Sequence, residues 1–529
     1  MAVSRLAAVP ALALSVLVVP AGQVPAGGGA PEPPAARAAL GTAGPPPGAA
    51  AVSECAPVPA AECGTVRVPL DRSHPGRGSI DVAYALIRHR DQSSPAAGTV
   101  VPNLGGPGGA AIKLAPVYVE ALGGLLADHD LLLIDPRGTG RSDRIQCGVA
   151  SLPATRDGLT RAVAGCGRSL GVRARGYISA ATADDIDAVR ARLRIPRLDL
   201  LGESYGTYLM TVYAQRHPGN IRSIVLSSAF PLAFDMWARP NARAIPRAIR
   251  LMCARSAGKC DGERTLAELA RLAQRLRQHP IPYQVPAEAE PRVLDETALA
   301  SIVYNAGMEL GQLPAIVRAA LAGDTAPLIA AAQALLPLSG SSADVGGPDL
   351  ALAAAVLCND YPTLWNRHVP VPVRLRQFAA GRAALPAGTF YPFSARAWTS
   401  AIIDRGNTCI RWPDRHGPVQ QTRGPFADVP VLVLSGDLDP NTPTEEGRLA
   451  ARQFRNSRVI EVPNVGHVPE SASGCAAAIL MDFIRAQQVR DTSCLADIPP
   501  FRSPSKSIAT LLTVKRLHRT RPTGGPGAH

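Results

Sequence analysis

Residues Leu198 to Tyr208, with the sequence LDLLGESYGTY, decide how this chain folds. An apolar run ends in Gly-x-Ser-x-Gly, with Ser204 at its centre, and residues 208–217 after it favour a helix. Small residues on both sides of Ser204 permit a sharp strand-to-helix turn that holds the serine in a strained conformation. The Ser204 hydroxyl is therefore expected to project from the carboxyl end of a central strand, beside a helix N-terminus. On its own, the pattern also fits an ordinary turn.

Strands alternate with helices around this stretch. Residues Thr182 to Leu193 predict a helix that opens with a Thr-x-x-Asp cap and leads into the Leu198 strand. Residues 64–70 and 79–87 alternate apolar and polar residues, as half-buried antiparallel strands do. The whole pattern predicts an α/β fold with a mostly parallel, doubly wound sheet. Buried strands are predicted from short apolar runs at 98–104, 129–134, 221–227, 429–435 and 457–462.

The length of the chain predicts a large insertion, because 529 residues exceed what one compact core normally holds. Between about 231 and 426 amphipathic helical segments replace the alternation of strands and helices. We therefore expect a first part of the core at 55–230, a helical cap at 231–426 and a second part of the core at 427–500. The cap is expected to lie over Ser204 and to restrict the access of water and of large substrates.

The two ends of the chain are expected to lie outside this core. Residues 1–30 predict a signal peptide, because a positive charge at Arg5 precedes an apolar run that is too short to span a bilayer. Residues 31–54, rich in Gly, Pro and Ala, predict a flexible leader, and a basic tail at 501–529 is expected to be disordered. We expect a secreted protein with no stable membrane association once the signal is cleaved; an uncleaved anchor is the alternative.

Ten cysteines agree with export, because disulfides persist in oxidising compartments. They allow about 945 pairings, so the sequence does not fix the connectivity, but short loops cost the least entropy to close. No Cys-x-x-Cys and no paired Cys/His spacing supports zinc, and no metal site is predicted. The expected pairs are Cys55 with Cys63, Cys147 with Cys166, Cys253 with Cys260 and Cys475 with Cys494, with Cys358 and Cys409 left as the widest pair.

The formal net charge of +13 raises the question of an acidic partner. Nearly all the basic residues are Arg, however, and Ala, Pro and Gly are abundant, which is typical of codon bias in a GC-rich genome. No run of Lys and Arg alternates with aromatic residues, so no nucleic-acid partner is expected.

Two further motifs follow predicted strands in the second half of the chain. Asp439 lies in the turn SGDLDPNTP and is the better candidate to orient a histidine, with Asp437 as the fallback. His467 lies in the loop VPNVGHVPE. Upstream, the glycine cluster at 105–109 can present backbone N–H groups inward, as an oxyanion hole requires. Ser204, Asp439 and His467 thus appear in the chain order Ser, Asp, His, each after its own strand, which is the order of an α/β-hydrolase triad.

From about Cys55 to Leu495 the chain resembles the secreted tripeptidyl-aminopeptidase and proline-iminopeptidase-like branch of the α/β-hydrolases. It departs from that branch at 227–231, where SSAFP stands in place of an Asp-Gly-x-x-Asp-Pro stretch. If that stretch helps to shape the substrate pocket, the departure bears on the aminopeptidase specificity and not on the triad. The motifs that carry the resemblance are GGPGG at 105–109, DPRGxGxS at 135–142, GESYGT at 202–207, CND at 358–360, CxxW at 409–412, DPxTP at 439–443 and GH at 466–467.

The resemblance implies a role for each matching residue. Ser204 is the nucleophile, His467 the general base and Asp439 the partner of the histidine. The N–H groups of Gly106 and Tyr205 form the oxyanion hole. Such a mechanism needs no metal and no organic cofactor.

The expected function is that of a secreted, monomeric serine exopeptidase that releases tripeptides or single residues from free N-termini of short peptides. An acidic pair in the cap that binds the α-amino group favours this function; the candidates are Glu203, Glu309 and Asp360. An esterase or amidase for small acyl substrates is the first alternative, because it uses the same triad. An inactive extracellular binding protein is the second, and the intact triad argues against it.

Overall fold

The structure is a computed structural model that describes residues 57–58, 61–147, 155–285, 291–305, 307–335, 349–413 and 419–500. The expected signal peptide, leader and basic tail lie outside the described residues. Within the described ranges, no helix is long and apolar enough to span a membrane.

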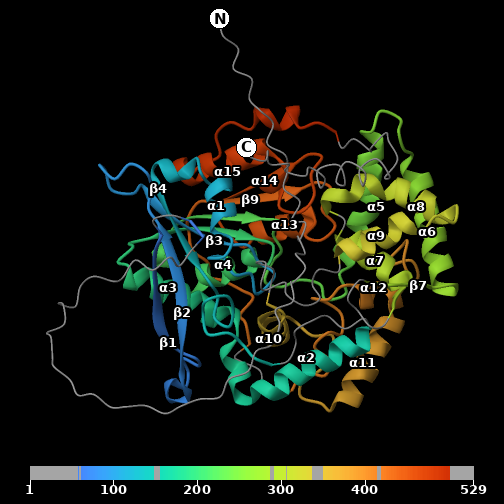
Figure 1. The fold of residues 1–529 in the computed structure, drawn as a ribbon, viewed down its shortest axis with the longest axis horizontal. Coiled ribbons are helices and arrows are strands. Elements are labelled where there is room, and N and C mark those ends of the chain that lie inside the picture. Colours follow the sequence, from blue (N-terminus) through green and yellow to red (C-terminus); the bar gives the residue numbers. More distant parts are fainter. Residues whose placement is uncertain are drawn as a thin grey trace, which may run out of the picture.

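An eight-stranded sheet forms the centre of the chain, in the order β1-β2-β4-β3-β5-β6-β9-β10 (Figure 1). Strand β2 pairs antiparallel with both β1 and β4, and all other neighbours pair in parallel. The predicted α/β fold with a mostly parallel, doubly wound sheet is thus confirmed. The strands are β1 (Glu62–Pro69), β2 (Ser79–Ile87), β3 (Gly98–Asn103), β4 (His129–Ile134), β5 (Leu198–Glu203), β6 (Ile221–Ser227), β9 (Val431–Gly436) and β10 (Ser457–Val462).

Both faces of the sheet are covered. In β4, Leu132 and Ile134 pack into one hydrophobic cluster, whereas Leu131 and Leu133 pack into another. Strands buried on both faces are continuous apolar runs, which is why the sequence predicted them. The first cluster contains residues of α2 (Arg156–Leu170), α3 (Ser179–Arg192), α4 (Tyr205–Arg216) and α13 (Thr444–Ala451), and the second contains residues of α1 (Ala115–Ala121) and α15 (Gly474–Ala486).

The segment between β6 and β9 is mainly helical, and most of it has a hydrophobic cluster of its own. Figure 1 shows its helices α5 to α9 gathered at one side of the sheet. One helix, α10 (Leu350–Asp360), packs instead in the first of the two clusters that cover the sheet, where it contacts α2. The segment expected to be a cap therefore also contributes a helix to the core, and the boundaries at 230 and 427 stay a prediction. The other elements are α5 (Arg239–Ala254), α6 (Gly262–Gln278), β7 (Ile281–Tyr283), β8 (Arg292–Leu294), α7 (Glu296–Asn305), α8 (Leu313–Leu321), α9 (Ala326–Leu335), α11 (Val371–Ala383) and α12 (Ala395–Ala401).

The predicted Thr182 cap is wrong, because α3 begins at Ser179. Asp360, 181 residues away in the sequence, accepts hydrogen bonds from Ser179 N at 2.7 Å and from Ser179 Oγ at 2.6 Å. It thereby satisfies an N–H group that a local cap would otherwise bind. The Thr182 hydroxyl instead donates to the Ile178 carbonyl. A cap supplied by such a distant residue leaves no local sequence pattern.

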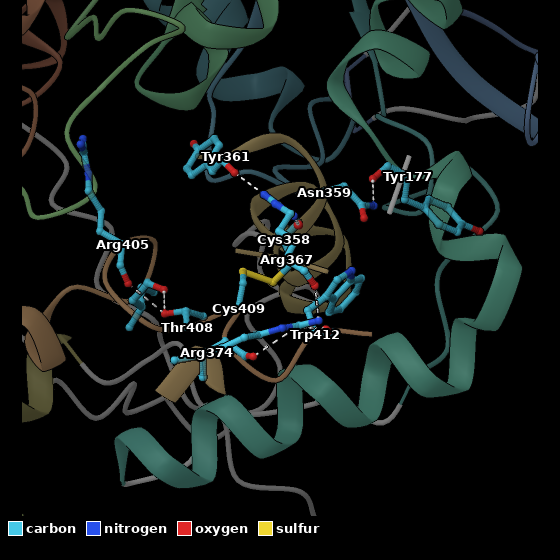
Figure 2. Close-up of a disulfide and its surroundings, with 12 residues drawn as sticks. Tyr177, Cys358, Asn359, Tyr361, Arg367, Arg374, Arg405, Thr408, Cys409 and Trp412 are labelled. Carbon is cyan, nitrogen blue, oxygen red and sulfur yellow. Dashed lines mark hydrogen bonds between the residues drawn. A yellow bond between two sulfur atoms is a disulfide. The ribbon is translucent and has the colours of Figure 1, made fainter. Parts of the chain in front are cut away.

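Four of the five predicted disulfides are present among the described residues: Cys147–Cys166, Cys253–Cys260, Cys358–Cys409 and Cys475–Cys494. The Cys55–Cys63 pair stays a prediction, because Cys55 lies outside the described residues. Figure 2 shows the Cys358–Cys409 bridge between α10 and the segment after α12. Beside it, the Arg367 guanidinium donates to the carbonyls of Cys358 and Tyr361.

The Cys358–Cys409 disulfide is expected to stabilise the fold more than any short-range bridge. It closes a separation of 51 residues, whereas Cys253–Cys260 closes one of 7. In the chain-entropy description, C358S/C409S lowers the free energy of unfolding by about 4 kcal/mol and C253S/C260S by about 2 kcal/mol. Urea unfolding of the two variants beside the parent protein checks this order. Equal losses would contradict it, and recovery of free Cys358 or Cys409 by peptide mapping without reductant would contradict the bridge itself.

Candidate active site

The turn between β5 and α4 holds Ser204 at φ 54° and ψ −121°, a conformation that non-glycine residues rarely adopt. Two neighbouring glycines make this turn possible. A Cβ atom on Gly202 would lie 2.5 Å from the Gly206 carbonyl oxygen, and one on Gly206 would collide with the Asn103 carbonyl oxygen at the end of β3. The Gly-x-Ser-x-Gly pattern is therefore required by the close approach of three backbone segments. It presents a half-buried Ser204 at the carboxyl edge of the sheet.

The glycine-rich loop after β3 packs directly against this turn. A Cβ on Gly105 would lie 2.5 Å from the Glu203 carbonyl oxygen and 2.8 Å from the Tyr205 nitrogen. Gly105 and Gly106 have φ values of 87° and 108°, which favour glycine. Tyr205 is the first residue of α4, where N–H groups have no partner within the helix. Gly105 thus lies close to the Tyr205 nitrogen, and Gly106 is the next residue in the chain. Two N–H groups that are to bind one oxyanion must lie close together in this way.

His467 and Asp439 lie at the ends of β10 and β9 and are joined by a hydrogen bond of 2.9 Å between His467 Nδ1 and Asp439 Oδ2. The carboxylate of Asp439 is fully buried and accepts further hydrogen bonds from Asn441 N at 2.8 Å and from Thr442 Oγ1 at 2.7 Å. Because Nδ1 is engaged, Nε2 is the ring nitrogen left to accept a proton. The Ser204 hydroxyl has no hydrogen-bond partner among the described residues, a common state when no substrate is bound.

Charges around the pair favour proton uptake by the histidine. Burial opposes a charge on His467, but Asp439 outweighs this effect, with contributions from Glu470 and Asp404, so the pKa of His467 is raised. Burial likewise opposes ionisation of Asp439, but His467 and Thr442 outweigh it and hold the pKa of Asp439 below its usual value. Asp439 is therefore ionised while it holds the imidazole.

Ser228, which the sequence analysis did not single out, holds the pair in place. Its hydroxyl donates to Asp439 Oδ2 at 3.2 Å and accepts from Val468 N at 2.7 Å, just after the histidine. It belongs to the SSAFP stretch that departs from the family pattern. The fallback carboxylate, Asp437, instead binds Arg255 at 2.5 Å and accepts from Asn464 N at 2.8 Å.

Of the residues expected to bind a substrate amine, the structure describes the side chains of Asp360 and Glu203. Asp360 is buried and caps α3, and burial raises its pKa to about 6. Glu203 lies beside a second carboxylate, Glu470, at the back of the turn, and burial and that charge raise its pKa to about 8. For Glu309 the structure describes no side chain.

A carboxylate that the sequence did not reveal, Asp404, also acts electrostatically on the histidine. Asp404 follows α12, is half-buried, and forms no side-chain hydrogen bond or ion pair with any residue that the structure describes. The adjacent Arg405 is paired with Glu446 at 3.4 Å. Burial, and then the negative charge of Asp404, raise the pKa of Tyr361; at His467 the Asp404 charge adds to the larger effects of Asp439 and Glu470. No spacing or motif around Asp404 indicates this position, because the fold alone brings it near His467.

The loop that carries Asp404 is fixed by the nearby disulfide. Thr408, next to Cys409, donates a hydrogen bond of 3.2 Å to the Arg405 carbonyl, and both residues are seen in Figure 2. Gly406 N donates to the Met236 carbonyl at 3.1 Å, which ties the loop to the segment after β6. The Arg156 guanidinium also donates to the carbonyls of Ile402 and Arg405 in this loop. Burial lowers the pKa of Arg156, and the negative charge of Asp404 opposes this shift. The carboxylate is therefore held in position near a cation with which it forms no ion pair among the described residues.

A serine on a strand-to-helix turn, with a His–Asp pair at the ends of two later strands of a mostly parallel sheet, defines an α/β-hydrolase. Residues 100–250 match the alpha/beta hydrolase fold family, and residues 394–494 match the family described as TAP-like protein. The second match spans Asp404, Asp439 and His467.

Two relatives of known class, both peptidases by name, are similar to this chain. The chain is 26% identical to a tripeptidyl aminopeptidase of Streptomyces coelicolor over 440 residues, 77% of each chain. It is 30% identical to the serine protease Hip1 of Mycobacterium bovis over 190 residues, which cover 32% of this chain and 36% of the relative. The chain is an enzyme, a serine hydrolase of the peptidase type on an α/β-hydrolase fold.

Proposed function

We propose that this chain is an exported serine exopeptidase that releases tripeptides or single residues from the free N-termini of short peptides. The observation that carries this function is the unpaired, half-buried carboxylate of Asp404 beside His467. The tripeptidyl aminopeptidase relative supports the reaction, and the four disulfides support an oxidising compartment.

In the proposed reaction Ser204 Oγ attacks the carbonyl carbon of the scissile bond while His467 Nε2 takes the hydroxyl proton. Asp439 holds the ring tautomer and stabilises the imidazolium. The N–H groups of Gly106 and Tyr205 bind the oxyanion of the tetrahedral intermediate. The intermediate collapses to an acyl-enzyme when His467 passes its proton to the leaving amine. Water then attacks the ester, with His467 again as base, and frees Ser204 and the released peptide.

In this proposal Asp404 binds the N-terminal ammonium group of the substrate, so the enzyme prefers peptides with a free N-terminus. A peptide ammonium group would form an ion pair with Asp404. The neighbouring Arg405 is already paired with Glu446. A charge-assisted contact of this kind is worth about 1.5–3 kcal/mol. The chain between β6 and β9 supplies Asp404, so a substrate reaching Ser204 meets this charge on the cap side of the site.

The test compares Ala-Ala-Ala p-nitroanilide with its N-acetylated form. The parent protein is expected to cleave the free peptide about 10- to 100-fold better in kcat/KM, because acetylation removes the positive charge. Asp404→Asn should remove most of this difference, mainly through KM. Asp324→Asn is the matched control, since this exposed carboxylate lies in the same insertion and, within the described chain, accepts only from Ala326 N.

Two results would redirect the proposal. Equal rates on free and acetylated peptides would favour the esterase or amidase function. Internal cuts in intact casein would contradict an exopeptidase altogether.

A further inference from the structure

Two carboxylates lie on either side of Ser227, next to the candidate nucleophile: Glu203 is opposite Ser227 in the β5–β6 pairing, and Glu470 accepts from the Ser227 hydroxyl. Glu203 ends β5 and precedes Ser204, and Glu470 is the second residue of α14 (Pro469–Ala472), three residues after His467. Ser227, the last residue of β6, connects the two sides. Its hydroxyl donates to Glu470 Oε2, and its carbonyl accepts a 3.0 Å hydrogen bond from Ser204 N. The acidic pair therefore touches both the serine turn and the histidine loop.

The surroundings of this pair do not neutralise it. The Tyr118 hydroxyl of α1 is buried without a hydrogen-bond partner in the described chain, and so is Glu470 Oε1. Within the same residues, no group of three or more His, Cys, Asp or Glu side chains is arranged to hold a metal ion. The titratable groups that face the pair are Tyr118 and His467, and His467 in turn faces Asp439 and Asp404.

Both carboxylates are half-buried, and with few compensating groups nearby each disfavours the charged form of the other. Burial, and then the charge of Glu470, raise the pKa of Glu203 to about 8. Burial also raises the pKa of Glu470, although the Ser227 hydroxyl and His467 both favour its ionised form. The proton therefore belongs mainly on Glu203, and the negative charge on Glu470.

We propose that Glu203 and Glu470 are positioning residues that share one proton near neutral pH, leaving a single negative charge on the histidine side. This inference rests on the proposed triad, because the charge acts through His467. The Glu470 charge favours the imidazolium that forms when Ser204 attacks. When pH rises and Glu203 gives its proton to the solvent, a second negative charge appears one residue before Ser204. That charge opposes the oxyanion held by Tyr205 N–H, so turnover falls.

The pH dependence of kcat/KM with p-nitrophenyl acetate tests this, because no substrate amine titrates. The parent protein should lose activity as pH rises through about 8. Glu203→Gln should remove that fall and leave the acidic limb in place. Glu470→Gln should move the acidic limb to lower pH by about one unit, since His467 loses a negative neighbour. Glu461→Gln is the control, because this carboxylate on β10 pairs with the exposed Arg448.

An alkaline fall that persists in Glu203→Gln, or an acidic limb unmoved in Glu470→Gln, would overturn the shared proton. If either variant fails to fold, infrared titration of the parent protein decides. A carboxylic-acid carbonyl band must survive above pH 7 and disappear near pH 8; its absence above pH 7 also overturns the inference. Ester turnover that persists in Ser204→Ala contradicts the triad itself, whereas normal Ser204 dependence with unchanged pH profiles contradicts the carboxylate pair alone.

Discussion

Replacement of Ser204 by alanine is expected to lower kcat by about 10⁴- to 10⁶-fold while the protein remains folded. The acyl-enzyme cannot form without the hydroxyl, and the remaining rate comes from substrate binding and the oxyanion donors alone. His467→Ala should be nearly as damaging, because serine and histidine act as one unit. The double variant should be little worse than either single one.

Turnover of a tripeptidyl anilide and thermal unfolding, measured on the same preparations, check this prediction. Ser471→Ala is the matched control, since this exposed serine lies four residues after His467 and, within the described chain, its hydroxyl donates only to the Val468 carbonyl. It should retain near-normal activity. Near-normal turnover in Ser204→Ala with an unchanged unfolding midpoint would contradict the assignment of the nucleophile.

Asp439→Asn is expected to lower kcat by about 10⁴-fold, because an amide in this position stabilises the wrong histidine tautomer and leaves the imidazolium without its counter-charge. The buried geometry makes the loss severe: Asp439 accepts at both oxygens, from His467 Nδ1 on one side and from Asn441 N on the other. An asparagine amide group cannot accept at both positions.

Asp437→Asn separates this effect from a general loss of negative charge near the turn. Asp437 binds Arg255 and Asn464 rather than the histidine, so its replacement should change kcat by less than about tenfold and act mainly on stability. If Asp437→Asn were the damaging change and Asp439→Asn the mild one, the observed Asp439–His467 hydrogen bond would not be the functional one.

Much of the fold was predictable because it depends on local patterns. The buried strands are continuous apolar runs, and Ser204 stands at the centre of a glycine-flanked turn between a strand and a helix. Asp439 and His467 each follow such a strand, so parallel pairing brings both to one edge of the sheet. The four described disulfides follow the expected chain neighbours and the one remaining wide pair.

What the sequence did not reveal depends on contacts between distant segments. Ser228 reaches Asp439 across 211 residues, and Ser227 reaches Glu470 across 243. Asp360 caps a helix that begins 181 residues earlier in the chain, and its role in substrate binding stays a prediction. Asp404 carries no local pattern, and its electrostatic effect on His467 depends on how the segment after α12 packs. Such roles depend on the packing of whole elements, which periodicity and spacing do not encode.

Covalent labelling shows whether Ser204 is the nucleophile of a peptidase. The protein is treated with a fluorophosphonate probe, digested and mapped by mass spectrometry, and the residual cleavage of Ala-Ala-Ala p-nitroanilide is measured in parallel. We predict one adduct, on the peptide that contains Ser204, with loss of activity in proportion to labelling and no labelling of Ser204→Ala or of protein unfolded beforehand. An adduct on another residue, or full peptidase activity after complete modification of Ser204, would contradict the account.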